Sequence, residues 1–125
     1  IRHELGCALK LVQLIGEDSW DQAPTDFAAM RTAEGLERLA ATVDGIGPWV
    51  NQLYQVADGG VTDAGLVSMA HAQGLVVHPY TFRNDALPEG FAAIDELFGF
   101  MIDDLAIDGL FTDFPDAAAR YLQRR

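Results

Sequence analysis

Two short polar segments that directly follow apolar runs contain the residues best suited to chemistry. The first covers residues 78–83, with the sequence HPYTFR, and the second covers residues 108–116, DGLFTDFPD. An apolar run that gives way to polar residues is typical of a buried strand that ends in a loop. In α/β barrels the loops at the carboxyl ends of the strands carry the active site. The two segments therefore favour an enzyme.

Tyr80 and Arg83 are the candidate ligand-binding residues of the first segment. An aromatic ring at a strand exit can hold an apolar or polyol part of a ligand, while the guanidinium meets an anion. The structural alternative makes Tyr80 a rim residue and Arg83 an ion-pair partner of Asp85. The residue types leave both interpretations open.

The titratable residues give no catalytic assignment and no metal site. His78 is the best acid or base candidate, because only histidine titrates near neutral pH without help. A buried, hydrogen-bonded histidine is nevertheless more common than a catalytic one. His3, His71 and His78 are too scattered for metal-ligand spacing, and there is a single cysteine. We therefore assign no catalytic residue and no metal ligand in this chain.

The second segment is expected to start the last helix. Asp113 and Asp116 flank Pro115. We expect Asp113 to cap the helix, Pro115 to occupy the first turn where no donor is missed, and Asp116 to complement the helix dipole. Asp113 and Asp116 are therefore assigned structural roles.

Four apolar runs, each followed by a helical pattern, must position these residues. The expected strands cover residues 9–15, 43–48, 75–78 and 110–112, and the expected helices begin near Thr32, Thr62, Phe91 and Pro115, with loops at 17–26 and 52–60. Residues 43–46 and 107–110 repeat the order apolar, Asp, Gly, apolar, and both are expected to turn from helix into strand. Repeated strand–helix units predict an α/β fold with parallel strands. Half of an eight-fold barrel and a small doubly wound sheet fit this pattern equally.

Composition and charge exclude several classes of protein. The 125 residues are half hydrophobic, as in one globular domain, and no apolar run reaches the roughly 20 residues that span a bilayer. The net charge of −11 opposes nucleic-acid binding. It also means that an anionic phosphodiester substrate would need a metal ion or a cluster of basic residues to offset repulsion.

Three successive segments resemble the glycerophosphodiester phosphodiesterases, particularly their secreted and periplasmic branch. These segments are residues 45–49 (GIGPW), 70–83 and 108–116, and residues 11–15 (LVQLI) are similar to the strand that precedes them. The resemblance covers nearly the whole chain and corresponds to strands five to eight of a (β/α)8 TIM barrel. It implies that residues 1–125 form the C-terminal half of the domain without its N-terminal half, in a periplasmic or secreted protein.

The resemblance implies hydrolysis of glycerophosphodiesters to sn-glycerol 3-phosphate and an alcohol by metal-assisted acid–base cleavage. In the family a divalent cation, Ca²⁺ or Mg²⁺, is held by carboxylates on the early strands, and two histidines come from the first half. This chain has no His-Arg-Gly opening and no Glu-x-Lys strand, so those roles have no position in it. What carries over is Tyr80, where many relatives have an aromatic residue lining the glycerol site, and Arg83. The alternative is a non-catalytic binding or interaction domain with the same fold.

A half barrel would expose two strand edges, at residues 9–15 and 110–112, and about half of its core. Exposed apolar patches of this size are rare on soluble monomers. We therefore expect the segment to pair with the missing N-terminal half or with a second copy of the chain, besides binding its small-molecule substrate.

Overall fold

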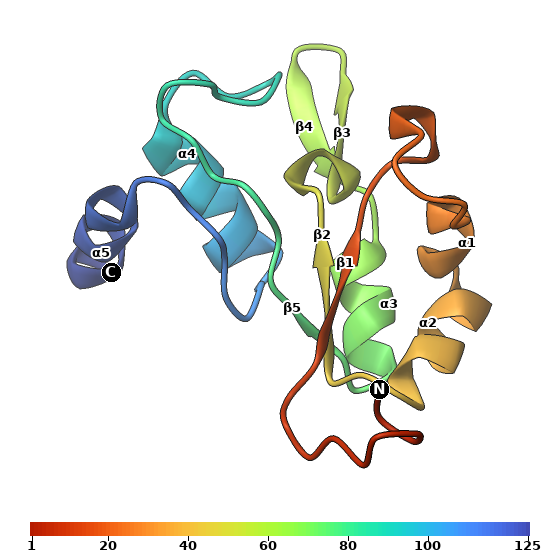
Figure 1. Ribbon diagram of the computed structural model, residues 1–125. Coiled ribbons are helices and arrows are strands. Elements are labelled where there is room, and N and C mark those ends of the chain that lie inside the picture. The colour runs from red at the N-terminus through yellow and green to blue at the C-terminus, as the bar shows by residue number, and fades with distance from the viewer.

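Three parallel strands form the centre of the structure, a computed structural model that describes residues 1–125 (Figure 1). Strand β1 (Val12–Ile15) pairs with β2 (Gly45–Pro48), which pairs in turn with β5 (Val76–Val77). In the register, Gly45 lies opposite both Val12 and Val76. The α/β fold class expected from the sequence is therefore confirmed.

The fourth expected strand lies beside the continuation of β5 but forms only a single bridge. Phe82 and Thr112 pair in parallel, and the Phe82 N–H donates to the Phe111 carbonyl at 2.9 Å. The Phe111 N–H donates in turn to the Pro79 carbonyl at 3.0 Å. The four segments thus run parallel in chain order, without the reversal of strand order that a doubly wound sheet has. They do not close into a barrel.

The helices largely follow the sequence pattern. Helix α2 (Ala33–Ala40) is capped as expected, since the Thr32 hydroxyl accepts a hydrogen bond from the Gly35 N–H at 3.0 Å. The helix expected from Phe91 begins later, as α4 (Ile94–Phe98), and continues as a π-helical segment. The remaining helices are the short α1 (Phe27–Met30), α3 (Leu66–Ala72), α5 (Pro115–Arg124), η1 (Asp18–Trp20), η2 (Val50–Gln52) and the π-helical η3 (Gly99–Asp104). No helix is both long enough and apolar enough to cross a membrane.

An antiparallel hairpin replaces the loop expected at residues 52–60 and the helix start expected at Thr62. Strands β3 (Tyr54–Ala57) and β4 (Gly60–Asp63) pair through a turn at Asp58 and Gly59, whose φ angles are 42° and 82°. Asp-Gly favours such a two-residue hairpin turn, because both central residues need positive φ. Both expectations were therefore wrong, and this dipeptide is the sequence signal that contradicted them.

Matching aspartates fix the entries of two strands. The Asp44 carboxylate accepts a hydrogen bond from the Leu11 N–H at 2.9 Å, and the Asp44 N–H donates to the Leu11 carbonyl at 2.8 Å. Asp108 makes the same pair of bonds with Val77, at 2.8 and 3.0 Å. The repeated Asp-Gly pattern is thus the turn from helix into strand that the sequence predicted.

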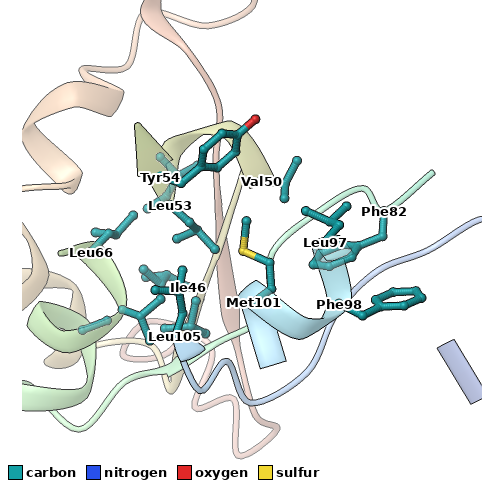
Figure 2. Packing of buried hydrophobic residues seen from close by; sticks show 14 of the residues in the cluster. Ile46, Val50, Leu53, Tyr54, Leu66, Phe82, Leu97, Phe98, Met101 and Leu105 are labelled. Atoms are coloured by element: carbon teal, nitrogen blue, oxygen red, sulfur yellow. The ribbon is translucent and has the colours of Figure 1, made fainter. Parts of the chain in front are cut away.

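The two faces of the sheet differ. Ile46 and Val77, which pair on β2 and β5, are fully buried in a core of 19 apolar residues to which the strands, η2, α3 and the α4–η3 segment contribute (Figure 2). The opposite face exposes 37% of Val12, 53% of Leu14 and 47% of Phe111. The apolar side chains on this second face are only partly covered by the rest of the chain.

We predict that Gly35→Ala lowers the free energy of unfolding by about 1–3 kcal/mol, the scale of an overpacked core. An added Cβ would lie 1.9 Å from the backbone oxygen of Ala29, where α1 and α2 meet. This clash outweighs the gain of about 1 kcal/mol that alanine gives a helix. Chemical denaturation measures the difference. Gly60→Ala is the control, since nothing lies within 4 Å of its added Cβ. An unfolding free energy for Gly35→Ala equal to that of the unchanged protein would contradict the prediction.

Candidate functional site

A hollow of about 390 Å³ lies at the carboxyl ends of β1, β2 and the segment that continues β5. Tyr80 and Arg83, the two residues singled out from the sequence, both line it. We call it the aromatic hollow. Its lining consists of Trp20, Trp49, Val50, Asn51, Tyr80, Thr81, Arg83, Ala86 and Pro88. The carboxyl ends of parallel strands are where α/β proteins place their ligands.

Three aromatic rings reach this hollow from three neighbouring strand exits. Trp20 follows β1, Trp49 directly follows β2, and Tyr80 forms a parallel bridge with Trp49. The two indole rings meet edge to face, with centroids 5.1 Å apart and planes at 67°. Gly16 allows this arrangement, because an added Cβ would lie 3.2 Å from the Trp20 ring. Sequence reasoning missed both tryptophans as site residues, although each follows a strand end within five residues.

The Tyr80 hydroxyl is held in place as a hydrogen-bond donor. It donates to the Ile15 carbonyl at 2.7 Å, which ties the end of β1 to the segment after β5. Burial raises the pKa of Tyr80, and the negative charge of Glu17 raises it further. The phenol therefore stays protonated at neutral pH. Its ring can offer a binding surface, but its oxygen is not a base.

Arg83 is paired with carboxylates, as the structural alternative proposed. Its Nε and Nη2 donate to the two oxygens of Asp85 at 3.0 and 2.7 Å. Asp113 adds a carboxylate oxygen 3.8 Å from Nε. The hydrogen bond from Arg83 lowers the pKa of Asp85, so the pair is fully charged at neutral pH. The positive charge of Arg83 is thus largely compensated within the chain.

Thr112, and not Asp113, organises the start of α5. The N-cap position is Phe114, without a side-chain cap, so the expectation that Asp113 caps this helix was wrong. Asp113 lies one residue too early to reach the free N–H groups of the first turn. The Thr112 hydroxyl donates to the Phe82 carbonyl at 2.7 Å and accepts from the Phe114 N–H at 3.0 Å. Asp116 pairs with Arg120 one turn later, at 2.7 Å.

The histidines lie outside the aromatic hollow. His78 packs against Gly109, where an added Cβ would be 3.0 Å from its Nε2. His71 Nε2 lies 2.7 Å from the Asp108 carboxylate at the strand entries. Burial pushes the pKa of Asp108 up, but its hydrogen bonds with His71 and the Val77 N–H outweigh burial and lower it. No three His, Cys, Asp or Glu side chains of residues 1–125 gather closely enough to hold a metal ion.

Comparison with known proteins gives a consistent result. The model of the "Glycerophosphoryl diester phosphodiesterase family" matches residues 1–117. A glycerophosphodiester phosphodiesterase of Haemophilus influenzae is 30% identical over 96% of this chain and 36% of its own length. Glycerophosphodiester phosphodiesterase GDPD6 of Arabidopsis thaliana is 33% identical over 76% of this chain and 27% of its own length. The chain therefore spans about a third or less of the length of these curated relatives.

We predict that Thr112→Val lowers the free energy of unfolding by about 1–3 kcal/mol, because it leaves the partly buried Phe82 carbonyl and Phe114 N–H without their partner. Asp113→Ala is the matched control and should change stability by less than about 0.5 kcal/mol, as at an ordinary surface position. Thermal or chemical denaturation of both variants measures these effects. A larger loss in Asp113→Ala than in Thr112→Val would restore Asp113 as the cap.

Proposed function

Because this chain belongs to the glycerophosphoryl diester phosphodiesterase family, we propose that it forms part of a phosphodiesterase whose intact polypeptide hydrolyses glycerophosphodiesters. The products would be sn-glycerol 3-phosphate and an alcohol. One observation carries the proposal: Tyr80, Arg83 and two tryptophans gather at the carboxyl ends of adjacent parallel strands. The chain would supply this wall of the substrate pocket.

We further propose that residues 1–125 are strands five to eight of a TIM barrel. Two features support this proposal. The four strand segments run parallel in chain order, as consecutive barrel strands do. The exposed face of the sheet carries Val12, Leu14, Val76 and Phe111, which would fill a barrel interior from one side. The remaining strands of the parent chain, or a second copy, would cover this face.

Within the aromatic hollow we assign the organic part of the substrate to Tyr80 and its phosphate side to Arg83. The ring is fixed by the hydrogen bond from its hydroxyl to Ile15, so it offers an ordered surface to a glycerol moiety. Arg83 already shares its charge with Asp85 and Asp113. It would therefore orient an anion rather than supply most of the charge that binds it.

A divalent cation, Ca²⁺ or Mg²⁺, would have to be bound elsewhere in the polypeptide. The residues present do not fit such an ion, because no cluster of three potential ligands exists among them. The net charge of −11 makes an additional source of positive charge necessary for an anionic substrate. We therefore assign no catalytic step to this segment. We also propose, from the branch of the family it resembles, a periplasmic or secreted location.

The alternative function is a non-catalytic binding or interaction domain of the same fold. The aromatic hollow also favours this alternative, because it holds neither a metal site nor a catalytic acid and base. The activity of the intact polypeptide decides between the two functions.

We predict that the full-length polypeptide hydrolyses glycerophosphocholine when Ca²⁺ or Mg²⁺ is supplied and loses this activity with a chelator. Residues 1–125 alone should show no turnover, because no group of three potential metal ligands gathers among them. Release of choline, measured by a coupled assay, tests the full-length polypeptide and the 125-residue chain. Turnover by the purified 125-residue chain would contradict the division of roles. An inert full-length polypeptide would favour the binding domain.

In the intact enzyme, Tyr80→Ala should lower kcat/KM by an amount equivalent to about 1–3 kcal/mol, the scale of losing one aromatic contact in a binding site. Tyr80→Phe separates the ring from the hydroxyl and should retain more of the activity. Steady-state kinetics of folded variants provide the measurement. An unchanged kcat/KM in Tyr80→Ala would return Tyr80 to a rim residue.

A further inference from the structure

The two tryptophans form a corner of the aromatic hollow that the glycerol assignment does not use. Trp20 is 37% exposed, and its ring meets Trp49 at 67°, so the two indoles form adjoining walls rather than one flat surface. Tyr80 lies on the next strand exit and lines the same hollow. Aromatic rings that surround a space in this way attract organic cations through their negative faces.

The charges around the hollow also favour a cation. Arg83 is the single charged residue in its lining, and it is paired with Asp85 and Asp113. Glu17 lies just before the helical turn that carries Trp20. Its carboxylate is 3.6 Å from Arg31 and accepts a hydrogen bond from Gln52 at 3.2 Å. These three carboxylates outnumber the two arginines that pair with them, and the chain carries a net charge of −11, so the approach of a positive group is favourable.

We propose that Trp20 and Trp49 form a subsite for the cationic head of the alcohol portion of the substrate, a quaternary ammonium such as that of choline. This inference rests on the proposed function, because it places glycerol at Tyr80 and the leaving alcohol beside it. A hollow of about 390 Å³ has room for both parts. The enzyme would then prefer glycerophosphodiesters of cationic alcohols to those of neutral alcohols of the same size.

Calorimetric titration of the full-length polypeptide with choline and with neohexyl alcohol tests this subsite. In neohexyl alcohol a carbon replaces the quaternary nitrogen, so shape is kept and charge is lost. We expect choline to bind roughly tenfold more tightly, as a cation over aromatic faces allows. Equal binding of the two compounds, or no measurable binding of choline, would overturn the proposal and leave a hollow for neutral groups.

Variants locate the effect. Trp20→Leu removes a partly exposed ring and should abolish the preference for choline, whereas Tyr121→Leu, which removes a ring on α5 outside the hollow, should retain it. Circular dichroism checks that both variants are folded. If Trp20→Leu does not fold, Trp20→Phe replaces it as the test, since its smaller ring should retain part of the preference for choline. A preference that persists in folded Trp20→Leu would overturn the assignment.

The outcome for the subsite is separable from the outcome for the proposed function. If the polypeptide hydrolyses glycerophosphocholine and glycerophosphoglycerol with equal kcat/KM and binds choline no better than neohexyl alcohol, the hydrolase stands and the cation subsite is wrong. If it binds choline selectively but hydrolyses neither diester, the subsite stands and the hydrolase is wrong.

Discussion

The hydrogen bonds of two aspartates at the strand entries set the register on which the rest of the structure depends. Asp44 ties β2 to the strand before it, and Asp108 ties the last strand segment to β5, each with both its carboxylate and its N–H. Charge-assisted bonds to backbone donors are stronger than ordinary amide bonds. Because each side chain points to the preceding strand, the pairs align the strands in parallel and in chain order.

The alignment of the strands at their amino ends brings aromatic residues together at their carboxyl ends. With the entries fixed, the carboxyl ends of β1 and β2 and the residue Tyr80 arrive at the same level. Tyr80 donates its hydroxyl to Ile15 and its N–H to Pro48, and its carbonyl accepts from Val50. The site is therefore built on hydrogen-bonded backbone, which holds its side chains on a rigid frame.

The lining of the aromatic hollow offers a surface for contacts rather than a free acid or base. Its phenol is held protonated, its guanidinium is neutralised by neighbouring carboxylates, and no group of metal ligands lies within the chain. A phosphodiesterase needs positive charge beside the phosphate of its substrate. The remaining part of such an enzyme would supply this charge. Under the proposed function, this division of roles would allow an acidic segment to form one wall of a pocket for an anionic diester.

The sequence by itself determined the α/β class, the Asp-Gly turns into strands and the start of α2 at Thr32, because these features depend on neighbouring residues and on local periodicity. Its periodicity left the strand order open, and the tertiary structure shows that the four segments follow chain order. The errors of the sequence prediction at residues 52–60 and at Asp113 were also local, and the Asp-Gly turn signal could have corrected the first. Only the tertiary structure decided that Trp20 meets Trp49 and that Asp113 approaches Arg83. These partners are separated by 29 and 30 positions in the sequence, and the packing of whole strands and helices sets their distance.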